Sequence, residues 1–168
     1  QAGEAVMKYV ACIVLVVGFG QAAIAQQLQS DAGIVRACFS NTPVGALYPT
    51  CLGEASGQCQ EQSGGSTTVG IAECISSETA AWDAILNEEY RATQAALEEQ
   101  DSAGGAQILD RTDALREAQR AWLTFRDADC TARYAIWQDG TIRTIVGANC
   151  HLTMTASRAI ELRDMRGF

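Results

Sequence analysis

Cysteine is the residue type whose chemistry this sequence makes easiest to read. Cysteine occurs seven times, and every cysteine except Cys12 lies beyond residue 25. The six cysteines beyond residue 25 form an even set, which in an exported chain indicates disulfide bonds. Neighbours along the chain suggest the pairs Cys38–Cys51, Cys59–Cys74 and Cys130–Cys150. Other connectivities remain formally possible.

The other reactive side chains give little support for catalysis or metal binding. His151 is the only histidine and directly follows Cys150, but a Cys–His nucleophile needs a free thiol and the later cysteines can all pair. The sequence has no C-x-x-C pair, no histidine cluster and no glycine-rich phosphate loop. Acidic residues are numerous, and none is singled out as a pair for glycoside cleavage. We therefore expect no enzyme activity, no metal and no cofactor.

The first part of the chain has the pattern of a secretory leader. A basic residue, an apolar stretch from Tyr9 to Phe19 and small residues up to Ala25 are typical of a signal peptide cut after Ala25. Residues 1–6, which precede Met7, are left out of the fold argument. The apolar stretch is shorter than the roughly 20 residues that span a bilayer. We expect residues 1–25 to be removed and the mature chain to be periplasmic or secreted, without membrane insertion.

The charge of the chain favours some partners and excludes others. The formal net charge is −8. Removing residues 1–25 takes away one acidic residue, Glu4, and one basic residue, Lys8, so the net charge is unchanged. Every basic residue after the leader is arginine. An acidic chain is a poor match for nucleic acid, which needs a basic surface, and a good match for a cationic protein.

The spacing of apolar residues predicts a helical protein. Sustained apolar and polar alternation, the pattern of strands, does not occur, whereas apolar residues recur every three, four or seven positions. Two short helices are expected between Gln27 and Glu61. The predicted fold is all-α: a small N-terminal helical segment over residues 26–62, and a core of about three long helices, stapled by disulfides, over residues 63–168. The long helices are expected at Thr67–Gln100, Ile108–Trp137 and Ala148–Met165.

Three blocks of sequence carry a family signature. They are the stretch from Cys74 to Tyr90, the run Leu115 to Cys130 with its W-x-x-F-R-D-x-x-C pattern, and the stretch from Gly140 to Leu162. Between about Cys59 and Leu162 these blocks resemble the lysozyme inhibitor LprI-like family of bacterial envelope proteins. The resemblance implies a helical, disulfide-stapled fold and, for its namesake, inhibition of lysozyme. The signature residues are Glu78, Trp82, Asp83, Asn87, Tyr90, Gln119, Trp122, Arg126 and Asp127.

Arg126 is the signature residue with the strongest physical requirement. Trp122, Arg126 and Cys130 are spaced by four, so they share one helix face and the guanidinium is drawn toward the core. A partly buried charge needs a partner. Glu78 or Asp83 on the preceding helix can supply one, and we favour this structural ion pair over direct ligand binding.

The remaining signature residues also have structural interpretations. Asn87 and Gln119 are expected to bridge backbone or side chains at a helix interface. Trp82, Trp122 and Tyr90 are expected to be core aromatics rather than a ligand platform.

A binding role is predicted for the connection between the second and third long helices. Residues 138–147 lie between the cysteines of one expected disulfide, so an exposed loop there is held at both ends. Asp139, Thr141 and Arg143 are the candidate contact residues, and Arg143 is placed to face the catalytic carboxylates of a lysozyme. The alternative is a plain connector with its apolar residues packed inward.

Two functions remain open at the level of sequence. The first is non-catalytic occlusion of a cationic protein such as lysozyme, steered by acidic charge. The second is a general periplasmic interaction module without affinity for lysozyme, because a fold does not determine a function.

Overall fold

The protein is described by a computed structural model that covers residues 27–104 and 108–167. Its described residues contain no strand. The predicted all-α fold is confirmed, with two short helices before three long ones. The elements are α1 (Ala32–Asn41), α2 (Glu54–Cys59), α3 (Thr68–Ala103), α4 (Arg111–Ile136), α5 (Arg143–Asp164) and a closing 3-10 turn, Met165–Gly167.

The expected leader, residues 1–25, lies outside the described residues, and its cleavage after Ala25 stays a prediction. Among the helices that the structure describes, none combines the length and the apolar character needed to cross a bilayer.

Two of the three long helices, α3 and α4, begin where polar side chains cap them. The Thr67 hydroxyl accepts a hydrogen bond from the Gly70 N–H at 3.0 Å, and the Asp110 carboxylate accepts one from the Asp113 N–H at 2.7 Å. Such caps satisfy donors that have no partner inside the helix. Gly70 also permits a close turn, because a Cβ there would lie 2.1 Å from the Gly64 carbonyl oxygen.

The third long helix starts five residues earlier than predicted. It begins at Arg143 rather than at residue 148, so only residues 137–142 connect it to α4. Ile145 packs against the hydrophobic core, and at Gly147 the missing side chain lets Tyr134 approach to within 3.3 Å of the position of a Cβ. β-Branched residues and glycine are weak helix formers, so the local sequence predicted a loop. Packing against α4 and the core overrides that preference.

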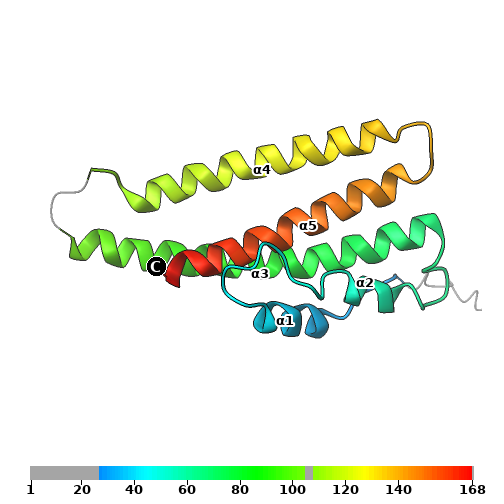
Figure 1. The fold of residues 1–168 in the computed structure, drawn as a ribbon, viewed down its shortest axis with the longest axis horizontal. Helices are drawn as coiled ribbons and strands as arrows, with labels where there is room; N and C mark the ends of the chain where they lie inside the picture. Colours follow the sequence, from blue (N-terminus) through cyan, green and yellow to red (C-terminus); the bar gives the residue numbers. More distant parts are fainter. Residues whose placement is uncertain (1–26, 105–107, 168) are drawn as a thin grey trace, which may run out of the picture.

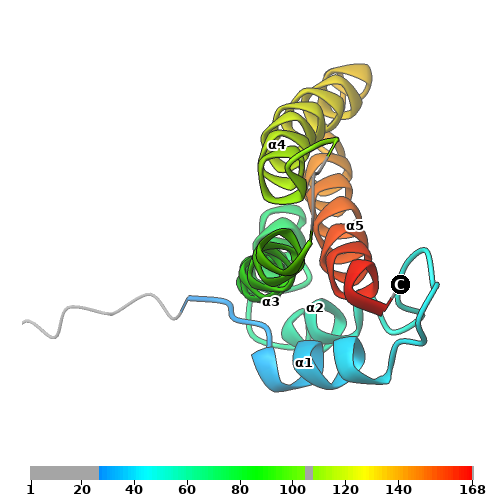
Figure 2. The same cartoon turned by 90° about the vertical axis from the view of Figure 1, so that its left-hand side faces the viewer.

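The helices are arranged around the pair α3 and α5. Figure 1 shows α4 lying along the upper side of α5, with α1 and α2 below α3. The end-on view in Figure 2 shows α3 and α5 side by side, α4 above them and the two short helices beneath. The most extensive helix contact is between α3 and α5, and α4 packs more closely on α5 than on α3.

The core fills the space between α3, α5 and the two short helices. Trp82 is its largest buried side chain and meets Phe39 of α1 edge to face, with ring centroids 6.2 Å apart. Burying a large apolar side chain contributes about 1.5–3 kcal/mol. Leu115 is the single residue of α4 among the buried members of this cluster. The other members are Val35, Cys38, Ala55, Ile75, Ile85, Leu86, Leu152, Ala156, Ala159 and Leu162.

Three disulfides tie these helices together. The structure joins Cys38 to Cys51, Cys59 to Cys74 and Cys130 to Cys150, which is the pairing suggested by neighbours in the sequence. The first holds the α1–α2 connection, the second links the end of α2 to α3, and the third clamps α4 to α5.

A buried carboxylate fastens α2 to α3. Glu78 of α3 is only 1% exposed. Its carboxylate accepts hydrogen bonds from the backbone N–H groups of Gly53 at 2.9 Å and Ser56 at 2.8 Å, and from the Trp82 indole N–H at 3.4 Å. Glu78 therefore caps the first turn of α2 from another helix, where negative charge is favoured.

We predict that Glu78→Ala destabilises the protein by about 2–4 kcal/mol, because it leaves buried N–H groups without an acceptor. Glu88→Ala is the matched control, since Glu88 lies on the same helix as Glu78 but forms an exposed pair with Arg36 of α1, and exposed pairs contribute little. Urea unfolding followed by circular dichroism measures both. Equal midpoints for the two variants would show that the Glu78 cap does not stabilise the fold.

Candidate functional site

Several signature residues line a groove between α3 and α4. The groove has a volume of about 510 Å³, and Asp83, Asn87 and Tyr90 of α3 face Gln119 of α4 across it. Asn87 does not bridge the helices: its amide donates to the Asp83 backbone carbonyl and carboxylate at 2.8 and 3.0 Å. Both of these hydrogen bonds of Asn87 are therefore made within α3, and neither crosses the groove to α4.

The signature aromatics lie in or beside the core. Trp82 is fully buried, while Tyr90 and Trp122 are partly buried and pack against the core cluster. The Trp122 ring also carries two guanidinium groups, that of Arg126 at 5.2 Å and that of Arg158 at 5.9 Å from its centroid. Arg126 belongs to the same helix as Trp122, so it is the cation–π contact of Arg158 that joins α5 to α4.

Of the two partners expected for Arg126, the structure pairs it with Asp83 and not with Glu78. Glu78 is bonded to α2, and the Asp83 carboxylate lies 3.9 Å from Arg126 Nη1, at the limit of an ion pair. The closer contacts of Arg126 are the exposed Asp127 carboxylate at 3.0 Å and the Thr155 hydroxyl at 3.4 Å. Arg126 therefore pairs loosely with Asp83 and not with Glu78. The physical reason is that α4 packs on α5, which leaves it farther from α3 than a simple antiparallel pair would be.

Arg158 is the buried arginine that sequence reasoning missed. It is 8% exposed, and it donates to the Gln119 side-chain oxygen at 2.9 Å and to Glu161 at 3.0 Å. Gln119 thus bridges α4 and α5, as expected of an amide at a helix interface. The signal was present in the sequence, because Arg158 lies four residues from both Met154 and Leu162, so helical spacing places it on the same face as these two apolar residues.

A wider groove opens at the other end of the α3–α4 seam. Its volume is about 1110 Å³, and it is lined largely by small side chains of α3 and α5 together with Tyr134 and His151. Cys150 is bonded to Cys130, so His151 has no free thiol beside it. Within residues 27–104 and 108–167, no three His, Cys, Asp or Glu side chains are grouped to hold a metal ion.

The α4–α5 connection is a short turn fixed by hydrogen bonds rather than a long loop. We call this turn, from Ile136 to Arg143, the tip. Arg143 lies in the first turn of α5, where its guanidinium donates to the Tyr134 hydroxyl at 2.8 Å and to the backbone carbonyls of Gly140 and Gln138 at 2.8 and 3.3 Å. These bonds close the turn between the two helices. Arg143 therefore has a structural task, whereas Asp139 and Thr141 of the expected loop are exposed. A direct contact of these three residues with a partner stays a prediction.

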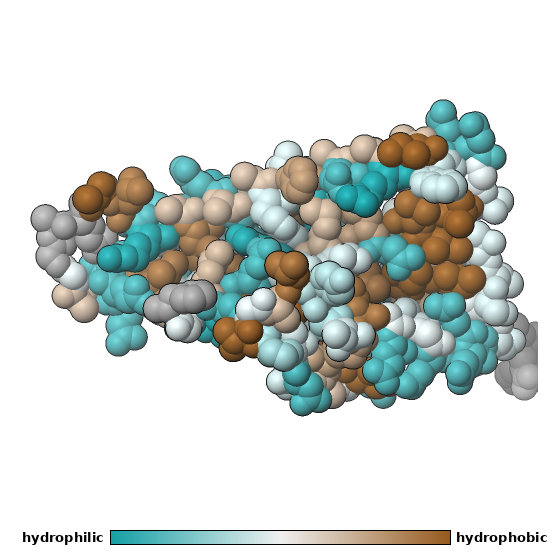
Figure 3. All heavy atoms as spheres, in the orientation of Figure 1, coloured by the Kyte–Doolittle hydropathy of each residue, from teal (hydrophilic) through white to brown (hydrophobic). Residues whose placement is uncertain are grey.

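Apolar side chains are exposed at this tip. Trp137 is 51% exposed, and its neighbours in this connection, Ile136 and Ile142, are also exposed. Figure 3 shows hydrophobic surface gathered over the start of α5 at the same end of the molecule. Exposed aromatic and aliphatic side chains on a rigid element are typical of protein-binding surfaces.

We predict that Arg158→Ala destabilises the protein more than Arg126→Ala does. Loss of Arg158 leaves the buried Gln119 oxygen unpaired, which costs about 1–3 kcal/mol, whereas the main ion-pair partner of Arg126, Asp127, is exposed to water. The measurement is the difference in urea midpoint between the two variants. A larger loss for Arg126→Ala would mean that its contact with Asp83 is stronger than the distance indicates.

Two proteins that are themselves described as uncharacterized are similar to this chain in sequence. A protein of Rhodobacter capsulatus, described as an uncharacterized 17.7 kDa protein in the puhA 5' region, is 25% identical over 154 residues, which is 89% of this chain and 91% of that protein. An uncharacterized protein of Rhizobium meliloti (strain 1021) is 30% identical over 95 residues, covering 55% of this chain and 68% of that protein. No solved structure matches significantly.

The family comparison covers the part of the chain that holds the signature residues. The model of the family described as "Lysozyme inhibitor LprI" matches residues 59–162, which is more than half of the chain. The matched range includes α3, α4, α5 and the last two disulfides. The chain therefore belongs to the lysozyme inhibitor LprI family.

Proposed function

We propose that this protein binds a lysozyme and blocks it without catalysing a reaction, using the α4–α5 tip as its main contact. Membership of the LprI family supports a protein partner of this class. The observation that carries the proposal is the exposed apolar cluster of Ile136, Trp137 and Ile142 on a covalently clamped turn.

The tip is suited to entering a cleft. It is built from the ends of two helices, and Figure 1 shows it above the start of α3 at one end of the long axis. Cys130–Cys150 and the bonds of Arg143 hold the turn in one conformation. A preorganised element loses little conformational entropy on binding. Tryptophan is one of the residue types enriched among the dominant contacts of protein interfaces, and Trp137 supplies one at the tip. Asp139, two residues further on, can supply a polar contact.

The charge of the protein supports a cationic partner. A net charge of −8 attracts a basic lysozyme over a distance of about one Debye length, roughly 8 Å at physiological ionic strength. This attraction raises the rate of encounter more than the final affinity.

The expected location is consistent with this role. Three disulfides are stable in an oxidising compartment, and the family is extracellular or periplasmic. We propose that the mature chain begins after Ala25 and meets lysozyme in the bacterial envelope. The second candidate is a general envelope interaction module without affinity for lysozyme. If the purified mature chain does not bind lysozyme, this second candidate replaces the first.

We predict that Ile136→Ala and Trp137→Ala each weaken lysozyme inhibition by about tenfold or more, because they remove apolar contacts at the centre of the interface. The assay is lysis of a cell-wall suspension by chicken-type lysozyme with increasing amounts of the purified mature protein. Ile108→Ala is the matched control, since Ile108 is fully exposed and lies at the opposite end of α4. Full inhibition by a folded Trp137→Ala variant would remove the tip from the interface.

We also predict that the association rate with a cationic lysozyme falls by about tenfold or more between low and high salt, because mobile ions screen the long-range attraction. Stopped-flow or surface-binding kinetics at several salt concentrations measure the rate directly. A dissociation rate that changes little would separate steering from contact. An association rate that is flat with salt would contradict the role given to the net charge.

A further inference from the structure

The connection between α1 and α2 exposes apolar side chains on a loop that carries no charge. From Thr42 to Gly53 the sequence has no Asp, Glu, Lys or Arg. Val44, Leu47 and Tyr48 are all exposed, Leu47 to 83%. Figure 2 shows this connection standing out from the helices beside α5. Exposing large apolar side chains to water is unfavourable, and several of them on one loop are typical of a surface that binds a partner.

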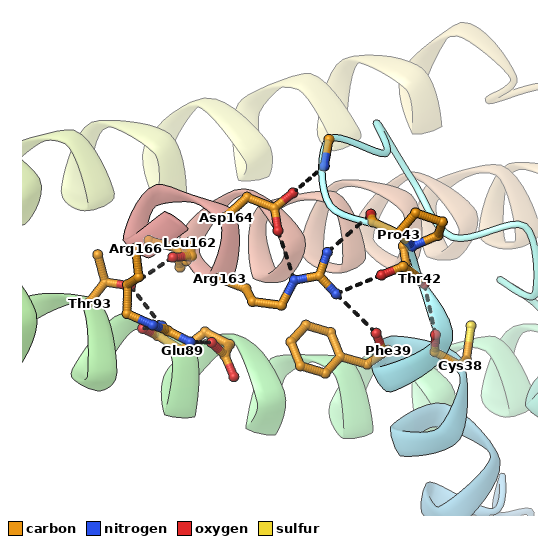
Figure 4. Close-up of polar contacts among 11 residues, drawn as sticks. Cys38, Phe39, Thr42, Pro43, Glu89, Thr93, Leu162, Arg163, Asp164 and Arg166 are labelled. Atoms are coloured by element: carbon orange, nitrogen blue, oxygen red, sulfur yellow. Dashed lines mark hydrogen bonds and ion pairs between the residues drawn. The ribbon is translucent and has the colours of Figure 1, made fainter. Parts of the chain in front are cut away.

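Arg163 of α5 fastens this loop to the bundle, as Figure 4 shows. Its guanidinium donates to the backbone carbonyls of Thr42 at 2.9 Å, Phe39 at 3.2 Å and Pro43 at 3.2 Å, and it lies over the Phe39 ring at 5.2 Å. The fork of an arginine is well matched to several acceptors at once. One side chain thus satisfies the end of α1 and fixes the direction in which the loop leaves it.

Asp164, the next residue, holds the loop at a second point. One carboxylate oxygen accepts from Arg163 Nε at 2.8 Å and the other accepts from the Gly45 N–H at 2.7 Å. Gly45 has a φ of 81°, in the left-handed region that favours glycine. Burial alone would raise the pKa of Asp164, but the hydrogen bonds from Arg163 and Gly45 and the charge of Arg163 outweigh it and lower that pKa below its ordinary value. The carboxylate is therefore charged, and the clamp intact, at neutral pH.

The disulfide Cys38–Cys51 closes the same loop, and Pro49 is buried at its base. The loop is thus held by one covalent bond and two charged side chains. Its ordered backbone and its exposed apolar side chains together describe a preorganised contact element.

The loop and the tip lie at two ends of one exposed face. A row of α5 residues spaced by three and four joins the tip to the loop, and each of its members is exposed or half-buried: Ile142, Val146, Asn149, Thr153, Ser157, Glu161 and Asp164. With a rise of about 1.5 Å per residue, the two ends are about 33 Å apart. That is the width of a protein interface of standard size, which buries about 800 Å² on each partner.

We infer that the loop Thr42–Thr50 is a second contact element that grips the same lysozyme as the tip. The inference rests on the proposed function. The loop lies before residue 59, where the family match begins, so it is an addition to the matched region. A second copy of this chain is disfavoured as the occupant, because two molecules of net charge −8 repel each other.

The test is calorimetric titration of the full mature chain with chicken-type lysozyme. Leu47→Asp places a charge in the apolar contact, and an affinity loss of about tenfold or more is expected. Leu109→Asp is the matched control: Leu109 is 74% exposed, lies at the far end of the molecule before α4, and receives the same added charge. Its affinity should stay within about twofold of the parent.

A double variant shows whether both elements act on one partner. Leu47→Asp combined with Ile136→Ala should lose affinity by about the product of the two single losses, because distant sites in one interface act independently. Unchanged melting curves exclude unfolding as the cause.

Each outcome decides something. A Leu47→Asp variant that binds like the parent overturns the second contact and leaves the proposed function standing. A parent chain that does not bind lysozyme overturns both. Light scattering that shows a dimer abolished by Leu47→Asp, with lysozyme affinity unchanged, assigns the loop to self-association and also overturns the inference.

Discussion

The arrangement of the N-terminal third depends on one buried carboxylate. Among the described residues no ion pair is formed by Glu78, and its carboxylate is held by backbone N–H groups at the first turn of α2 and by the Trp82 indole N–H. A buried carboxylate needs donors in fixed positions, so Glu78 determines where α2 lies against α3. The disulfide Cys59–Cys74 then closes over the same contact. The position of the loop that carries Leu47 is set by this α2–α3 contact at one end and by Arg163 and Asp164 of α5 at the other.

The second constraint is the unequal packing of α4. Trp122 and Gln119 of α4 contact the buried Arg158 of α5, and α4 contributes little to the central core. The seam between α3 and α4 is left as a groove. Cys130–Cys150 prevents the far end of α4 from separating, and this makes the tip rigid even though α4 is mostly solvated. Rigidity at the tip is therefore supplied by covalent and polar contacts rather than by a deep core.

Much of the fold was predictable from the sequence because its signals are local. Apolar spacing of three and four predicts α3 and α4, and the same pairing of neighbouring cysteines appears in the structure. The misses are tertiary. The choice between Asp83 and Glu78 as the partner of Arg126 depends on the distance between α3 and α4, and the early start of α5 depends on how Tyr134 packs on Gly147. Neither quantity can be derived from the spacing of apolar residues within one helix.

The order of the disulfides along the chain has a consequence for biogenesis. Each bond joins a cysteine to the next one in sequence, with separations of 13, 15 and 20 residues. If the chain enters an oxidising compartment from its N-terminus, each of the six paired cysteines meets its native partner before any later competitor arrives. Oxidation in order of arrival yields the native set directly, and no shuffling of incorrect bonds is required.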